Sequence, residues 1–195
     1  TNATYVDSGI NMQLRLVHVQ EMNIPGAESV TSEGLDTLRR NSTVQSMRAQ
    51  YGAALVAMLN SSTENVCGRA YLSSGNNGNF YSNADDNAYS VSGGGLRCGF
   101  FTFAHEIGHN LGLGHSRKQG NTGGLYGYGV GHGVDNEFVT IMAYPSAFNT
   151  RSRLRRYSDP SSNACNGFAC GVDLQFSNSA DSVRAVNNSL SQIAD

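Results

Sequence analysis

The chain has 195 residues, of which 14% are charged and 23 are glycine, and its formal net charge is -2. This length suffices for one domain with a hydrophobic core, and the composition is typical of a loop-rich globular domain. A nucleic-acid-binding surface would need a basic excess, which the sequence lacks. The longest apolar run, residues 53–59, is far shorter than the roughly 20 residues that cross a bilayer, so we expect no membrane association through a spanning helix.

The four cysteines form no C-x-x-C pair, which argues against a cysteine zinc site or a thioredoxin-like motif. Their even number, in a chain rich in Asn, Ser and Gly, predicts two disulfides and an oxidising compartment. Of the three pairings we favour Cys67 with Cys98 and Cys165 with Cys170, the second closing a short loop. Residues 1–10 lack the basic start and apolar stretch of a signal peptide. The predicted disulfides favour a secreted protein, and in that case its export signal has already been removed.

In the first half of the chain, periodicity predicts both strands and helices. Apolar and polar residues alternate over residues 11–20, which predicts a half-buried strand. Residues 32–50 have helical spacing, with a break expected at residues 41–43. Short segments typical of further strands are residues 53–59, 67–73 and 88–92.

In the second half, residues 102–111 have a helical pattern that Gly112 and Gly114 would end. Residues 116–137 are rich in glycine and show little periodicity, so we expect a loop. Ser179 is a candidate cap of a last helix, whose apolar face would comprise Val183, Val186, Leu190 and Ile193. Without internal repeats or linkers, the sequence predicts one domain.

Residues 105–115 contain the motif H-E-x-x-H-x-x-G-x-x-H. On a helix, His105 and His109 project from the same face one turn apart, so both imidazoles can bind one zinc ion. His115 reaches the same ion only if the chain turns sharply, and Gly112 permits that turn because glycine adopts a positive φ at little cost. Two histidines at this spacing also occur without a metal, but the added glycine and third histidine make the pattern specific.

Three neutral imidazoles leave a fourth tetrahedral position for water, which is typical of catalytic zinc. Bound Zn²⁺ would lower the pKa of that water to about 7. Glu106 is then the expected general base, which takes a proton from the water and returns it to the leaving amine. The remaining histidines, His18 and His132, are expected to be ordinary polar residues.

The long zinc motif and the later segment 140–144, T-I-M-A-Y, resemble the metzincin superfamily of zinc endopeptidases. In that superfamily a methionine-containing turn lies beneath the metal, so the resemblance implies a supporting role for Met142. It also implies an α/β fold, with a twisted mixed sheet, an active-site helix and a smaller, loop-rich C-terminal lobe ending in a helix. We expect a single catalytic domain over residues 1–195, with an upper lobe to about residue 112 and a lower lobe over residues 113–195.

The segment C-G-R-A-Y-L at residues 67–72 and the motif H-N-L-G in the helix are similar to reprolysin-type proteases and to bacterial peptidyl-Asp metallopeptidases. This resemblance implies that Gly68, Arg69 and Ala70 lie in an edge strand that pairs with extended substrate. Ser116 departs from the aspartate that reprolysins usually have there. The position of Tyr144 instead resembles a tyrosine of astacins and serralysins that approaches the metal or the oxyanion.

Four arginines, Arg151, Arg153, Arg155 and Arg156, follow the methionine segment. In metzincins this part of the chain forms the wall of the pocket for the residue after the scissile bond. We hypothesise that one or two of these arginines favour aspartate or glutamate there, because guanidinium binds carboxylate in a bidentate geometry. The alternative is a solvated basic loop.

Residues 75–87 are rich in oxygen ligands for Ca²⁺ but do not match an EF-hand, so a calcium site and an ordinary loop both stay open. The sequence thus predicts a secreted, zinc-dependent endopeptidase that acts on proteins or peptides, is monomeric and is made with an inhibitory prosegment. One alternative is a binding module that keeps the zinc fold without turnover, and another is a zinc hydrolase of non-peptide amides or esters.

Overall fold

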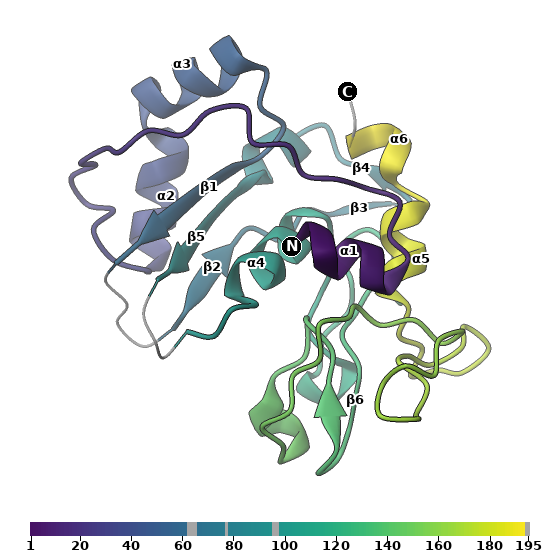
Figure 1. Cartoon of the computed structure of the whole chain (residues 1–195). Coiled ribbons are helices and arrows are strands. Elements are labelled where there is room, and N and C mark those ends of the chain that lie inside the picture. Colours follow the sequence, from purple (N-terminus) through teal and green to yellow (C-terminus); the bar gives the residue numbers. More distant parts are fainter. Residues whose placement is uncertain (62–65, 77, 95–97, 194–195) are drawn as a thin grey trace.

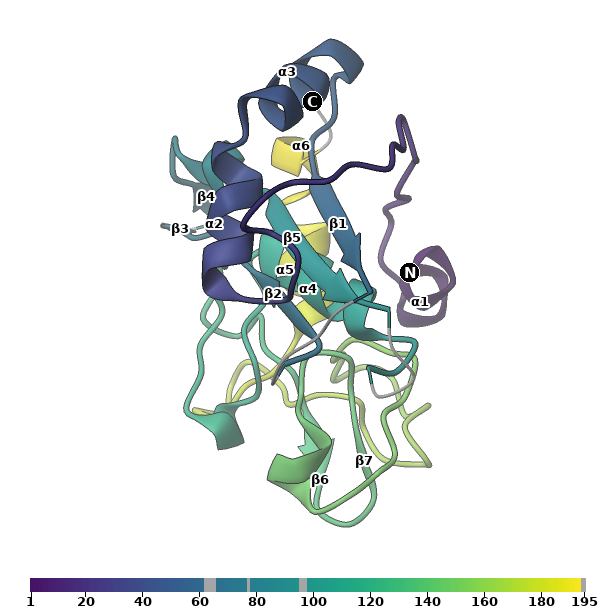
Figure 2. The same ribbon diagram turned by 90° about the vertical axis from the view of Figure 1, so that its left-hand side faces the viewer.

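The computed structural model describes residues 1–61, 66–76, 78–94 and 98–193. A small mixed sheet lies at its centre, with helices on both faces (Figures 1 and 2). The order of its strands is β1–β5–β2, and their bounds are Val56–Asn60 for β1, Tyr89–Gly93 for β5 and Gly68–Ala70 for β2. β1 is parallel to β5 and β2 is antiparallel to it. The expected mixed α/β architecture is therefore confirmed, and β2 lies at an edge of the sheet.

Strand β5 is buried on both faces because a helix covers each one. Tyr89 and Val91 share a core cluster with Leu35 and Leu38 of helix α2, Ser32–Arg40. Because side chains alternate along a strand, Ser90 and Ser92 face the other side of the sheet, where both are buried. Helix α4, Thr102–Asn110, lies there (Figure 2). The sheet thus supports the helix that carries the histidine motif.

The predicted helical stretch 32–50 is divided where the sequence indicates. α2 ends at Arg40, and α3 spans Ser42–Tyr51. Asn41 separates them, because its side-chain oxygen accepts a hydrogen bond from Val44 N at 3.0 Å and caps the second helix. The three strands predicted from short apolar segments are confirmed as β1, β2 and β5.

The strand predicted over residues 11–20 is wrong. After α1, Asn2–Ser8, this segment crosses the face seen in Figure 1 with no strand pairing in the described residues. Its backbone bonds to side chains instead: Leu14 N donates to Asn2 Oδ1, and Leu14 O accepts from Asn2 Nδ2. Leu16 stays 79% exposed. Alternation predicts a strand only where a neighbouring backbone supplies the ladder.

The last helical stretch begins later than expected. α5 spans Ser182–Asn187, and its cap is Asp181, whose Oδ1 accepts from Arg184 N at 2.9 Å. The prediction that Ser179 caps the helix is therefore wrong. Asp181 is the cap, because it lies three residues before Arg184, whose N–H has no acceptor within the first turn of the helix. A break follows at Asn188 and Ser189, and the short α6, Leu190–Ile193, ends the described chain.

The remaining elements are short and lie in connecting segments. They are β3 Gly75–Asn76, β4 Asn79–Phe80, η1 Ala84–Asn87, η2 Arg117–Gln119, β6 Gly133–Val134, β7 Phe138–Val139 and η3 Pro145–Phe148. The loop expected over residues 116–137 thus contains one 3-10 turn and one strand of a two-stranded ribbon. Both favoured disulfides, Cys67–Cys98 and Cys165–Cys170, are present. Within the described ranges, no helix has the length and apolar character needed to span a membrane.

Candidate metal centre and substrate cleft

The apolar residues and the histidines of helix α4 lie on different faces of the helix. Ala104, Ile107 and Leu111 belong to the main core cluster, while His105 and His109 lie on another face. The helix ends in a Schellman arrangement, since Leu113 N donates to Gly108 O and Gly112 N donates to His109 O, both at 2.9 Å. Gly112 has a φ of 83°. This turn redirects the chain toward His115.

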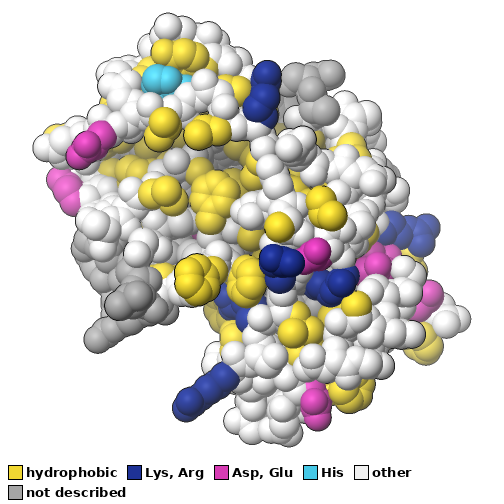
Figure 3. All heavy atoms as spheres, in the orientation of Figure 1, with side chains coloured by type: hydrophobic (Ala, Val, Ile, Leu, Met, Phe, Trp, Pro, Cys, Tyr) yellow, Lys and Arg dark blue, Asp and Glu magenta, His cyan; other side chains and the backbone are white. Residues whose placement is uncertain are grey.

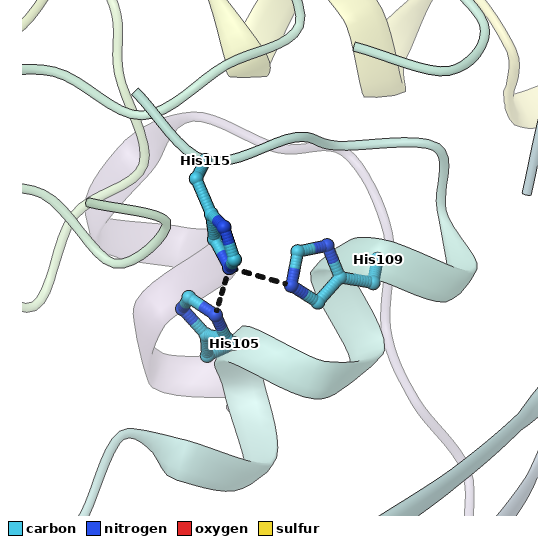
Figure 4. Close-up of side chains that lie close together, drawn as sticks. All are labelled: His105, His109 and His115. Atoms are coloured by element: carbon cyan, nitrogen blue, oxygen red, sulfur yellow. Dashed lines mark hydrogen bonds between the residues drawn. The ribbon is translucent and has the colours of Figure 1, made fainter. Parts of the chain in front are cut away.

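The three histidines of the motif converge on one point (Figure 4). Nε2 of His115 lies 3.2 Å from Nε2 of His105 and 3.1 Å from Nε2 of His109. Zn–N bonds of 2.0–2.1 Å in tetrahedral geometry place two ligand nitrogens about 3.3 Å apart. In the described part of the chain, these three histidines form the only cluster of three or more His, Cys, Asp or Glu side chains that could hold a metal ion. The donor set therefore fits zinc.

Backbone carbonyls orient two of the imidazoles. His105 Nδ1 donates to Ile141 O at 2.8 Å, and His109 Nδ1 donates to Leu113 O at 2.7 Å. In each ring the proton is thus placed on Nδ1, which leaves the lone pair of Nε2 for a metal. Burial holds the pKa of His105 well below its usual range, lowers that of His109 to about 4 and also lowers that of His115. All three are therefore neutral at neutral pH, as metal ligands must be.

Glu106 lies beside the histidines with only 5% of its surface exposed. Burial raises its pKa to about 8, while the positive charges of Arg153 and Arg69 act in the opposite direction. Its carboxylate lies against the backbone of β2, since a β-carbon added at Gly68 would overlap Oε1 of Glu106. A bound cation would favour the ionised carboxylate, which is the form that can accept a proton.

Met142 is fully buried in the core cluster below the histidines. It packs so closely on α4 that a β-carbon at Gly108 would overlap its sulfur. The preceding residue, Ile141, supplies the carbonyl that orients His105. The methionine segment thus both fills the space under the helix and holds one of the histidines.

Tyr144 lies at the open side of the histidine cluster. Its ring centroid is 4.4 Å from that of His115 and 5.7 Å from that of His105. Its side chain is partly exposed, and burial together with the negative charge of Glu106 raises its pKa. The phenol is therefore protonated at neutral pH and can donate a hydrogen bond.

A cleft of about 420 Å³ joins the histidines to the edge strand. Its walls come from β2, α2 and the histidine cluster, and include Gly68, Arg69, Ala70, Glu106 and Tyr144. In Figure 3 a notch separates the part that contains the sheet from the part below, and cationic side chains lie at its back. The edge of β2 thus faces the same cleft as the candidate metal ligands.

The sequence of the chain matches a known metallopeptidase family. A family model described as "Metallo-peptidase family M12B Reprolysin-like" matches residues 1–116, more than half of the chain and all three histidines. The chain belongs to this family. Membership and the three-histidine cluster together support zinc binding.

Two further similarities place this reprolysin-like chain among known proteins. It is 39% identical to the peptidyl-Asp metalloendopeptidase of Pseudomonas aeruginosa, in an alignment of 213 residues that covers 100% of the chain and 35% of that protein. The chain therefore spans about a third of the length of this curated relative. A chain in the solved "Structure of a chaperone-substrate complex" matches with a TM-score of 0.73 at 24% identity, covering 98% of this chain and 29% of that one, which supports the fold.

The arginines after the methionine segment have different surroundings. Arg155 pairs with Asp7 Oδ2 at 2.6 Å, and Arg156 donates to the carbonyl of Asp7. Arg151 is exposed. Arg153 instead turns toward the site: its Nη2 donates to Ala143 O at 3.2 Å, and its charge influences both Glu106 and Tyr144. Among the described residues its buried Nε has no hydrogen-bond partner.

Two polar residues that organise the site are not among those predicted from the sequence. Asn110 is buried, and its Nδ2 donates to three carbonyls, those of Asn87, Tyr89 and Tyr71, which ties α4 to the sheet. Gln119 accepts hydrogen bonds from Ser116, which follows His115, and from the backbone N–H of Tyr144. The only local signal for Asn110 is a polar residue amid an apolar helix face, because its partners lie far away in sequence. Gln119 has a local signal, since Ser116 and Gln119 match the capping-box pattern S-x-x-Q. Its bond to Tyr144 N lies outside that local pattern.

The segment proposed for calcium and the two other histidines lie apart from the cluster. Asp85 pairs with Arg48 at 3.4 Å. The ring of His18 stacks on Tyr51, and His132 lies near the ring of Phe138. Calcium binding stays a prediction.

Proposed function

We propose that this reprolysin-like domain is a zinc-dependent endopeptidase in which His105, His109 and His115 hold the metal. The observation that carries the proposal is the convergence of three neutral Nε2 atoms beside a buried carboxylate and an open strand edge. When bound, zinc would lower the pKa of a water molecule and polarise the substrate carbonyl.

Glu106 is proposed as the general base. Its place against β2 puts the carboxylate between the edge strand and the histidines. It accepts a proton from the attacking water and returns that proton to the leaving amine, so one residue serves both half-reactions. Protonated Tyr144, on the open side of His115, is proposed to donate a hydrogen bond to the developing oxyanion.

The edge strand is proposed to bind extended substrate. Gly68, Arg69 and Ala70 pair with β5 on one side and line the cleft on the other. Backbone groups on such an edge can form an added antiparallel ladder with a peptide. This arrangement supports peptides over small amides or esters as substrates.

We also propose that the enzyme favours aspartate or glutamate after the scissile bond. Of the candidates Arg151, Arg153 and Arg155, we favour Arg153, because its charge interacts with the cleft residues Glu106 and Tyr144. Its buried Nε also has no hydrogen-bond partner among the residues that the structure describes. A buried guanidinium without a carboxylate partner gains most from a substrate that brings one. The name of the Pseudomonas aeruginosa relative, a peptidyl-Asp metalloendopeptidase, supports the same preference.

The test is to incubate the zinc-loaded protein with an unfolded protein substrate and to map the cut sites by mass spectrometry. We expect internal cuts enriched in acidic residues on the C-terminal side of the broken bond, and no cuts after chelation. Absence of cleavage by zinc-loaded protein would favour a binding module or a non-peptide hydrolase. The disulfides support a secreted protein, and secretion, a monomeric state and an inhibitory prosegment stay proposals.

A further inference from the structure

The three candidate ligands differ in how their rings are held. His105 and His109 each donate from Nδ1 to a backbone carbonyl. For His115, no hydrogen bond to Nδ1 is found in the part of the chain that the structure describes. Its ring instead packs on the ring of Tyr144, with centroids 4.4 Å apart and planes 49° apart. The rings of His109 and His105 lie farther from it, at 4.7 and 5.1 Å. Tyr144 is thus the nearest ring against His115, on a residue that is not itself a candidate ligand.

Gln119 holds Tyr144 and the residue after His115 together. Its Oε1 accepts hydrogen bonds from Tyr144 N at 3.0 Å, from Ser116 Oγ at 2.8 Å and from Ser116 N at 3.4 Å. Ser116 is buried, so its hydroxyl and N–H have little access to water. A single amide oxygen thus joins the residue after the third histidine to the last residue of the methionine segment.

We propose that Gln119 is a positioning residue that fixes the ring of the third zinc ligand through Tyr144 and Ser116. The proposal rests on the proposed function, in which His115 binds zinc. Without the amide oxygen, the backbone of Tyr144 and the Ser116 turn lose their common anchor, and the ring of His115 loses the surface that orients it. Groups that orient metal ligands typically change metal affinity or activity by about 10–100-fold when removed.

The test measures the rate of zinc transfer to a chelator and the visible spectrum of the cobalt-substituted protein, which reports ligand geometry. The variants are Gln119→Ala, Gln119→Met and Gln119→Glu. The methionine keeps the side-chain length without the acceptor. The glutamate keeps the acceptor, because all three bonds are donated to Oε1 and none of them uses Nε2.

Gln192→Ala is the matched control. Gln192 in α6 also fastens a loop, since its Oε1 accepts from Phe80 N at 2.9 Å and its Nε2 donates to Gly78 O at 2.7 Å. We expect Gln119→Ala and Gln119→Met to release zinc about tenfold faster, with an altered cobalt spectrum. We expect Gln119→Glu and Gln192→Ala to match the original protein.

Equal release rates and spectra for all variants would overturn the role of Gln119 while leaving the zinc site intact. An equal effect of Gln192→Ala would also overturn it, because general loosening would then explain the change. Failure of the unmodified protein to bind zinc would instead overturn the proposed function. Far-ultraviolet circular dichroism of each variant identifies any that does not fold. If Gln119→Ala does not fold, Gln119→Met and Gln119→Glu are compared with the original protein instead.

Discussion

The carboxylate of Glu106 lies against the backbone of Gly68, at a place where a β-carbon would overlap Oε1. Gly68 belongs to the edge strand β2, and Glu106 belongs to the helix α4 that carries two of the histidines. The proposed general base and the proposed substrate-binding strand are therefore in direct contact. The lack of a side chain at Gly68 leaves the space that the carboxylate of Glu106 occupies.

This contact predicts the effect of Gly68→Ala. The added methyl group displaces the Glu106 carboxylate, and a shift of about 1 Å at a reacting group costs about a hundredfold in rate. We expect kcat/KM to fall by about that factor with zinc content unchanged. Gly94→Ala is the control, because a β-carbon there meets only Asn60 O at 3.6 Å. Equal activity of both variants would show that the contact does not position the base.

Arg153→Ala is expected to remove the preference for acidic residues. A hydrogen bond to a charged group contributes about 1.5–3 kcal/mol, so kcat/KM should fall about 10–100-fold for a peptide with aspartate after the scissile bond. A matched peptide with alanine there should be cut as before. Arg151→Ala, at an exposed arginine, should change neither rate. If Arg151→Ala abolishes the preference and Arg153→Ala does not, the assignment of Arg153 is wrong.

The features predicted correctly are those whose causes are local in sequence. The spacing of His105 and His109, and the glycine that ends their helix, act within one or two turns. The strand predicted over residues 11–20 failed because a strand requires a partner that alternation does not reveal. The sequence also gives no reason to separate Arg153 from Arg155. In the structure Arg155 forms an ion pair with Asp7, which lies far away in sequence.

In the metal-free protein, Glu106 makes stability depend on pH between 6.5 and 8. Its pKa is about 8 in the folded state and near 4.5 when unfolded, so in this range the folded state keeps a proton that the unfolded chain has released. Stability therefore falls as pH rises. The histidines, whose folded pKa values are lowered from 6.5, contribute a change only below about pH 6.5.

Urea unfolding of chelated protein at pH 6.5 and pH 8 measures this dependence. We expect the unfolding midpoint to fall between the two values in the original protein and to stay nearly constant in Glu106→Gln. A parallel fall in both proteins would assign the dependence to another group.

The two disulfides are expected to differ in their effect on stability. Cys67–Cys98 closes a loop with a sequence separation of 31, and Cys165–Cys170 one with a separation of 5. The chain-entropy model gives about 4 kcal/mol for the first and about 2 kcal/mol for the second. Thermal unfolding of the two double serine variants compares them. A larger loss from the Cys165 and Cys170 pair would contradict the loop-entropy explanation.

We propose that a metal held by the three histidines acts together with Glu106 to hydrolyse peptide bonds. The most direct measurement is kcat/KM on one internally quenched peptide for the original protein and Glu106→Gln, each shown to contain one zinc ion per chain. We predict that the variant binds zinc equally and loses activity by a factor of about a hundred or more. Equal hydrolysis by the two proteins at equal zinc content would contradict the claim.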